Sequence, residues 1–247
     1  MLLLMLTLAA VPALPRAPVP AVPVARSQPG EDPERLYADR VHVASAERAA
    51  ALWEAQLARD RRNVDAAWKL ARACYWLGGH VAREEQRRQY ERGVEAGRTA
   101  AALSPRRPEG HFWMAANMGA LAESFGLRQG LKYRGAIKDS LETVLAIDPA
   151  FQQGSADRAL GRWYFKVPGV FGGSNEKAVD HLRRSLVHHP DSTASHYFLA
   201  ETFLEMHRRP EARAELQKVL DAPLDPEWTP EDEEFKAKAR ARLATIE

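Results

Sequence analysis

Apolar residues recur along most of this chain at the three- and four-residue spacing of an amphipathic α-helix, in short segments separated by turns. In the stretch 157–190, Leu160 and Tyr164 lie on one apolar stripe. Ala178 and Leu182 lie on a second stripe, after a glycine-rich break. Two short amphipathic helices joined by a turn cannot bury their apolar faces alone, so they must stack on neighbours. The pattern therefore predicts a helical hairpin within an array of hairpins.

The hairpin pattern repeats along the chain. Pairs of small or apolar residues begin at positions 70, 115, 160 and 199, which are 45, 45 and 39 residues apart. A proline follows the second helix of each pair, at Pro105, Pro149, Pro190 and Pro223. Tetratricopeptide repeats have a related order of leucine, glycine, aromatic residue, alanine and proline, with a period of about 34 residues. The chain is therefore predicted to be an all-α, tetratricopeptide-like helix-pair solenoid.

Five helix pairs and one further helix account for the periodic part of the sequence. The expected pairs cover residues 34–59, 64–103, 111–149, 157–190 and 195–223. A last helix, rich in charged residues, is expected over 229–246. Thr229 as its N-cap, Pro230 in its first position and acidic residues in its first turn form a favourable helix start. We predict that this helix caps the C-terminal end of the array.

Single residues predict where several helices begin and end. Ser45 is expected to cap the helix over 46–59, because its hydroxyl can accept a hydrogen bond from a free N–H group. Gly78 and Gly79 are expected to end the following helix. The glycines of segment 126–130 are expected to form a loop inside the third pair.

A glycine-rich insert, residues 167–174, separates the two helices of the fourth pair. It precedes a helix N-terminus, where backbone N–H groups can hold an anion. It lacks the Lys-Ser/Thr ending of a phosphate-binding loop, however, and it follows no strand. We interpret it as a structural turn, with Ser174 or Asn175 as the helix cap and Phe171 available for contact with another subunit.

The N-terminus differs from the rest of the chain. Residues 2–14 are almost wholly apolar, and the sequence is then rich in proline and alanine as far as residue 29. The apolar run is too short to span a bilayer comfortably and is typical of a secretory signal, although no Lys or Arg precedes it. We assign residues 1–29 to a leader and spacer and residues 30–247 to the repeat domain. We expect a periplasmic or envelope location rather than a cytoplasmic one, with the leader either cleaved or kept as an anchor.

Composition and motif content exclude several function classes. The chain has 35 Lys and Arg against 33 Asp and Glu, a net charge of +2 that does not favour nucleic acid or an anionic membrane as the main partner. The single cysteine, Cys74, forms no intrachain disulfide and is expected to be a small core residue. None of the eight histidines has the spacing of a metal site, and no nucleophile motif is present. The sequence therefore predicts a protein that is not an enzyme and needs no cofactor or metal.

Three segments resemble a known family: LARACYWLGG, FQQGSADRALGRWYFKVPGVFGGSNEKAVDHLRRSL and FLAETFLEMHRRPEARAEL. They are similar to the TatT-like T-component proteins associated with bacterial TRAP transporters, over about residues 34–243 and most specifically over 161–174. The resemblance implies an exported helical repeat protein that binds a TRAP-type solute-binding protein and a hydrophobic ligand, and that forms a trimer. This chain has no cysteine near its N-terminus, so it departs from the lipid-anchored members.

The phase of the repeats predicts a binding groove. In stacked helix pairs the first helices line the concave face. Ten residues on those helices are expected to face it: Trp68, Arg72, Tyr75, Trp113, Asn117, Arg158, Arg162, Phe165, Tyr197 and Glu201. Aromatic rings with arginines between them suit an extended peptide or an acyl ligand with a carboxylate, which we expect Arg72 and Arg162 to bind. The alternative is that the tryptophans only fill the core between repeats.

Two functions fit these observations. The first is a periplasmic adaptor or ligand-holding component of TRAP-type solute uptake, which binds a protein partner and a hydrophobic anion in its groove. The second is a general scaffold for protein assembly, in the envelope or the cytosol, without a small-molecule ligand. Both need the same solenoid fold.

Overall fold

The computed structural model describes residues 31–246, so the expected leader, residues 1–29, lies outside the described part of the chain. The helices are α1 (Pro33–Ala38), α2 (Val43–Arg59), α3 (Val64–His80), α4 (Arg83–Leu103), α5 (Pro108–Ser124), α6 (Leu127–Ile147), α7 (Phe151–Lys166), α8 (Asn175–His188), α9 (Thr193–Glu205), α10 (Arg209–Asp221) and α11 (Thr229–Leu243). A short 3₁₀ helix, η1 (Gly169–Phe171), joins α7 to α8. Over the described residues there is no strand, and the predicted all-α class is confirmed.

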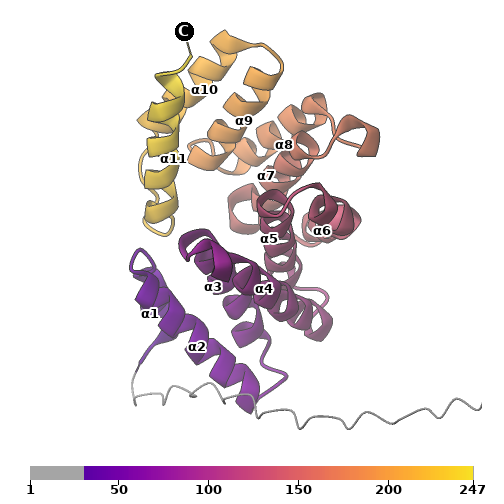
Figure 1. Ribbon diagram of the computed structural model, residues 1–247, viewed down its shortest axis with the longest axis vertical. Helices are drawn as coiled ribbons and strands as arrows, with labels where there is room; N and C mark the ends of the chain where they lie inside the picture. The colour runs from indigo at the N-terminus through magenta and orange to yellow at the C-terminus, as the bar shows by residue number, and fades with distance from the viewer. Residues whose placement is uncertain (1–30, 247) are drawn as a thin grey trace, which may run out of the picture.

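Successive helices form the five predicted pairs, and α11 packs against α9 and α10 as a cap. The first helices of the later pairs also contact one another, α3 with α5, α5 with α7 and α7 with α9. They form an inner layer, with α4, α6, α8 and α10 on its outer side (Figure 1). The array curves so strongly that α11, at the C-terminal end, comes back beside α1 and α3 (Figure 1). The predicted solenoid with a capping helix is thus confirmed.

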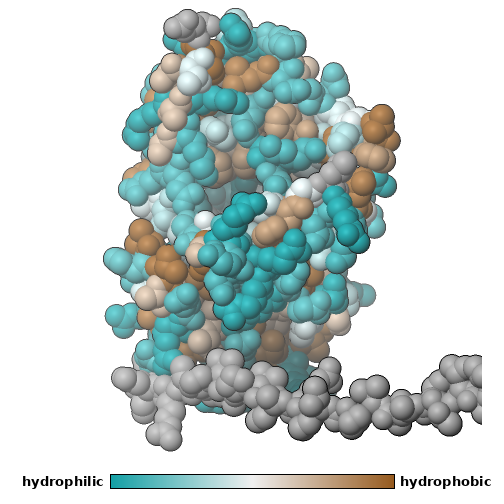
Figure 2. Space-filling view, viewed as in Figure 1, coloured by the Kyte–Doolittle hydropathy of each residue, from teal (hydrophilic) through white to brown (hydrophobic). Residues whose placement is uncertain are grey.

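The buried residues form two hydrophobic clusters, one from α1 to α8 and one from α8 to α11, and most helices contribute one large, fully buried side chain. These side chains are Trp53, Leu77, Leu121, Leu141, Leu160, Leu182, Leu199 and Leu216. Each such burial stabilises the fold by about 1.5–3 kcal/mol relative to an exposed side chain. The outer surface is mostly hydrophilic, with apolar residues gathered in a few patches (Figure 2). Cys74 is buried in the core, as predicted, and burial raises the pKa of its thiol to about 12.

Glycine allows α4 and α5 to approach closely. A Cβ atom on Gly97 would lie 2.7 Å from the backbone nitrogen of Met114 on α5. A Cβ atom on Gly110 would lie 2.4 Å from the backbone nitrogen of Ala101 on α4. At both points the contacted atoms belong to the backbone, which cannot rotate away as a flexible side chain can. The spacing of these two helices therefore requires residues without a side chain.

Two predicted helix boundaries near the N-terminus are wrong. Helix α2 begins at Val43 with His42 as its N-cap, so Ser45 lies inside the first turn. The Ser45 hydroxyl instead donates to the Asp39 carboxylate, 2.7 Å away. Gly78 and Gly79 do not end α3, which continues to His80. Tertiary packing explains this difference, because a Cβ atom on Gly78 would lie 2.2 Å from the ring of Tyr90.

Two further boundaries also differ from expectation. The predicted loop over residues 126–130 is helical from Leu127 onward, and only Gly126 has a left-handed backbone, with φ of 82°. Thr229 is the first residue of α11 rather than its cap, which is Trp228. The Thr229 hydroxyl donates to the Asp225 carbonyl oxygen, 2.8 Å away. The Ser174 cap is confirmed, because its hydroxyl oxygen accepts a hydrogen bond from the Lys177 N–H.

Replacing Gly97 tests the requirement for close helix approach. We expect Gly97→Ala to lower the free energy of unfolding by about 1–3 kcal/mol, because the added methyl group forces α4 away from α5. Urea unfolding followed by circular dichroism measures this change.

Gly135 is the matched control, since it lies in α6 with no atom within 4 Å of an added Cβ. Gly135→Ala is expected to stabilise the protein by about 0.5–1 kcal/mol through helix propensity. Equal effects of the two substitutions would contradict the packing argument.

Candidate ligand-binding cavity

The curved array surrounds a partly open cavity of about 900 Å³ on its concave side. Residues of α3, α5, α7, α9 and α11 line it, with further residues from α6 and the connecting segments. Eleven of the lining residues are aromatic, among them Tyr75, Trp113, Tyr197, Phe198 and Phe235. This volume and these aromatic side chains in the wall are typical of sites for small apolar ligands.

Six of the ten residues predicted for the groove line this cavity. They are Tyr75, Trp113, Arg158, Arg162, Tyr197 and Glu201, and they come from α3, α5, α7 and α9. The side chains at equivalent places in successive first helices thus face one shared space. The rings of Tyr75 and Trp113 lie 5.8 Å apart, so residues of two neighbouring repeats form one aromatic wall.

The other four predicted residues lie elsewhere. The Asn117 amide is buried between α3 and α5, where it donates to the Ala71 carbonyl at 3.0 Å and to the Trp113 carbonyl at 2.8 Å. Trp68 and Phe165 do not line the cavity. Neither does Arg72, which forms an ion pair with Glu34 of α1 and lies over the Tyr37 ring. The first helix pair therefore covers this part of α3.

Arg162 lines the cavity, but its charge is already compensated. Its guanidinium forms two hydrogen bonds with the Glu123 carboxylate, of 2.9 and 3.1 Å, and a further ion pair with Glu201. It also lies 4.7 Å from the centroid of the Phe198 ring. Because these partners come from α5 and α9, Arg162 ties three successive repeats together. Arg72 and Arg162, the predicted carboxylate-binding residues, are thus both occupied by glutamates.

Arg158, one helical turn before Arg162, has a different environment. Among the described residues, no side chain or backbone group forms a hydrogen bond or an ion pair with its guanidinium. Burial lowers the pKa of Arg158, while the Tyr75 hydroxyl and Asp232 oppose this effect weakly. Arginine remains protonated even so. The Asp232 carboxylate accepts hydrogen bonds from Thr193 and from the Asp225 N–H. The aromatic cavity therefore holds an uncompensated cation.

A strained backbone turn forms another part of the wall. Gln152 and Gln153, at the start of α7, have φ angles of 43° and 59°, and Gly154 follows with 76°. For residues other than glycine this left-handed conformation costs about 1–2 kcal/mol each. The Gln153 side-chain amide donates to the Asp225 carboxylate at 3.0 Å, whereas the side-chain oxygen of Gln152, Oε1, is buried without a partner in the described chain. Such strain is characteristic of functional sites.

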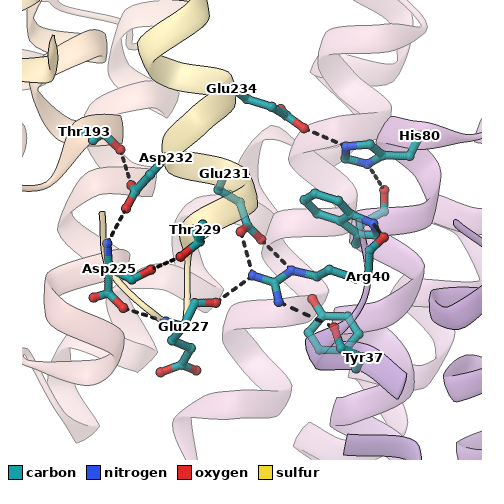
Figure 3. Close-up of polar contacts among 11 residues, drawn as sticks. Tyr37, Arg40, His80, Thr193, Asp225, Glu227, Thr229, Glu231, Asp232 and Glu234 are labelled. Carbon is teal, nitrogen blue, oxygen red and sulfur yellow. Dashed lines mark hydrogen bonds and ion pairs between the residues drawn. The ribbon is translucent and has the colours of Figure 1, made fainter. Parts of the chain in front are cut away.

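Side-chain contacts join the two ends of the array beside the cavity (Figure 3). Arg40, in the turn between α1 and α2, is buried and forms an ion pair of 2.6 Å with Glu231 of α11. It also donates to the Glu227 carbonyl oxygen at 2.7 Å. His80, at the end of α3, lies 2.7 Å from the Glu234 carboxylate and stacks on the Trp76 ring. These contacts hold α11 against the first two helix pairs.

The sequence pattern did not identify Arg40, His80, Glu231 or Glu234. Arg40 and Glu231 are 191 residues apart, and neither belongs to a motif. A charged residue at a helix end is usually solvated, so its position alone gives no sign of a distant partner.

Other kinds of site find little support in the described part of the chain. Within residues 31–246, no three His, Cys, Asp or Glu side chains gather as metal ligands would. None of the described helices is long and apolar enough to cross a membrane.

Comparisons with known proteins agree with this architecture. A family model described as "Regulator of microtubule dynamics protein 1-3" matches residues 36–247. No curated protein matches the sequence. TTC0263, a thermophilic TPR protein of Thermus thermophilus, is 23% identical, with a TM-score of 0.64 over 86% of this chain and 97% of that chain.

Two structures of MamA are also similar. A crystal structure of MamA is 17% identical, with a TM-score of 0.51, over 81% of this chain and 95% of that chain. MamA 41-end from Desulfovibrio magneticus RS-1 is 17% identical, with a TM-score of 0.51, over 78% and 96% of the two chains. At these identities the likeness shows a shared tetratricopeptide-repeat fold. Such a helical repeat array is suited to protein–protein interaction.

The contact between His80 and Glu234 predicts a shifted pKa for this histidine. The hydrogen bond to Glu234 raises the pKa of His80 above its ordinary value of 6.5, although burial opposes the shift. Because the folded-state pKa is raised, the stabilising effect of the charged imidazole is complete below pH 6.5 and is lost as the pH rises through the folded-state value. An NMR titration of the His80 ring measures this pKa directly.

Glu234→Gln is expected to lower the His80 pKa in the same titration. Glu233→Gln is the control, because Glu233 is the adjacent, exposed acid of α11. A His80 pKa that is the same in both variants would refute the assigned pairing.

Proposed function

This chain belongs to the regulator of microtubule dynamics protein 1-3 family, and we propose that it is a non-enzymatic binding protein whose cavity holds a hydrophobic carboxylate. The observation that carries this proposal is the uncompensated guanidinium of Arg158 inside an aromatic cavity. The carboxylate would bind at Arg158, and the apolar part of the ligand would lie against the surrounding rings.

Electrostatics supports an anion at Arg158. A charge that is partly removed from water costs free energy unless a partner of opposite charge compensates it. Six acidic residues line the cavity, and four of them, Glu123, Glu201, Glu231 and Glu234, form ion pairs with other cations. The planar guanidinium of arginine suits a carboxylate, with which it forms two parallel hydrogen bonds. A ligand carboxylate would thus supply the partner that the protein itself does not provide.

The rest of the wall supports an apolar body for the ligand. Tyr197 and Phe198 of α9 contact Phe235 of the capping helix, with ring centroids 5.6 and 5.5 Å apart. Tyr75 is 43% exposed, and it lines the cavity. Burial of large aromatic surfaces of this kind against an apolar chain is energetically favourable. A hydrophilic ligand would leave the apolar faces of these rings unburied.

The partner and location follow from the resemblance of the sequence to T-component proteins. We propose a TRAP-type solute-binding protein as the partner, in the periplasm or envelope, with a trimer as the assembly. No comparison names such a transporter. The competing function is a general assembly scaffold without a small ligand. The unpaired Arg158 favours the ligand-holding function, because a scaffold that binds only on its outer surface has no use for an isolated internal cation.

Arg158→Gln tests the carboxylate site. Isothermal titration with dodecanoate should show affinity weakened about tenfold to a hundredfold, as expected for losing charge-assisted hydrogen bonds of about 1.5–3 kcal/mol. Dodecanol, which has the same chain without the charge, should bind both proteins equally.

Arg183→Gln, an exposed arginine on the outer helix α8, is the control and should leave dodecanoate binding unchanged. If the parent protein does not bind dodecanoate, or if Arg158→Gln binds it as well as the parent does, the proposal fails.

A further inference from the structure

The turn between α7 and α8 exposes apolar side chains. Val170 is 88% exposed, more than any other large hydrophobic residue of residues 31–246, and Phe171 is 39% exposed. We call these two residues of η1 the apolar tip. Figure 2 shows an apolar patch on the right-hand edge of the molecule, where this turn protrudes in Figure 1. Exposed apolar side chains that project together mark interaction sites.

The backbone holds the apolar tip in a defined position. The Phe171 N–H donates to the Pro168 carbonyl at 2.8 Å, and the Ser174 N–H donates to the Tyr164 carbonyl at 3.0 Å. Gly172 has a φ of 102°, and a Cβ atom on Gly173 would lie 1.6 Å from the Val167 carbonyl oxygen. The turn itself therefore needs its glycines and hydrogen bonds. It does not need large apolar side chains at its most exposed positions.

Two cations without acidic partners lie near the tip. The Arg134 guanidinium is 5.5 Å from the centroid of the Phe171 ring, which places the first half of α6 beside the tip. Residues 126–138 contain no acidic residue, and neither do residues 158–175. We call Arg134 and Lys166, the last residue of α7, the basic rim; within the described chain neither forms an ion pair. The first acid after the tip is Glu176, which accepts a hydrogen bond from Ser174.

We propose that the apolar tip and the basic rim dock this protein on an anionic lipid surface. Basic residues are attracted to acidic headgroups, and the apolar tip would enter the boundary between headgroups and acyl chains. A membrane suits this surface better than a protein partner does. The tip is a convex projection of two side chains without a complementary groove, and lipid requires no directional contacts from it. The basic rim would interact with many acidic headgroups at once rather than with single carboxylates.

The docking surface is continuous with the cavity. Several residues of this region also line the cavity: Leu131, Arg134, Lys166, Val167 and Pro168. Docking would therefore bring the rim of the cavity to the lipid headgroups. The proposed docking depends only on the apolar tip and the basic rim, so vesicle binding can be measured without a ligand in the cavity.

A fluorescent probe at the tip tests the proposal in the full chain. The single native cysteine, Cys74, is buried, so Val170→Cys provides one surface thiol for an environment-sensitive nitrobenzoxadiazole label. Vesicles of phosphatidylcholine with phosphatidylserine should shift its emission to the blue and increase it severalfold. Phosphatidylcholine vesicles alone should have little effect. The same label at Val187→Cys, which is 77% exposed on α8, should not respond to either.

Charge substitutions give the second measurement. Arg134→Gln and Lys166→Gln are combined in the labelled Val170→Cys protein. The concentration of phosphatidylserine vesicles that gives half of the emission change should then rise about twentyfold. Arg183→Gln should not change it. The inference is overturned if the Val170→Cys label does not respond to phosphatidylserine vesicles, or if the double substitution titrates like the control. Dodecanoate binding should persist in Val170→Asp with Phe171→Asp, which separates this inference from the cavity ligand.

Discussion

Close stacking of helix pairs is the constraint on which the rest of this structure depends, because no single pair can bury its own apolar face. The stacking needs small residues as much as large ones. Leucines such as Leu160 and Leu182 fill the interior of each pair, while Gly97 and Gly110 let α4 and α5 approach until backbones touch. Asn117 adds a buried polar contact between α3 and α5. Because every pair is stacked in the same way, the first helices form one inner layer, and the array curves around it.

The curvature brings the two ends of the array together, and polar side chains then hold them. Arg40 and Glu231 form this contact with nearly ideal geometry, and the Glu227 carbonyl oxygen adds a further acceptor. Buried ion pairs often contribute little net stability, because desolvation offsets their attraction. The fixed geometry of the Arg40–Glu231 pair is more important here, because it determines where α11 packs against the first helix pairs. That position places α11 along one side of the cavity, which remains partly open.

Charge compensation distinguishes two arginines that are one helical turn apart. Arg162 is bound by Glu123 and Glu201 and thereby links three repeats, so its role in this structure is architectural. Arg158 projects into the same cavity without a partner among the described residues, close to the left-handed turn at Gln152 and Gln153. Natural proteins depart from full polar satisfaction and relaxed backbone geometry mainly at functional sites. The coincidence of both departures on one wall is the reason for proposing this side of α7 as the binding surface.

The amino-acid sequence by itself determined the all-α class, the five helix pairs, the capping helix and the Ser174 cap, because these depend on apolar spacing and turn residues within a few dozen positions. Six of the ten residues expected to face the groove line the cavity. Only the tertiary structure decided that Gly78 lies inside a helix against Tyr90, that Arg72 and Arg162 are paired, and that Arg158 is not. Helical periodicity specifies which face of each helix is apolar. It does not specify the tilt between neighbouring helices, and that tilt decides which charges meet across 38 to 191 residues of chain.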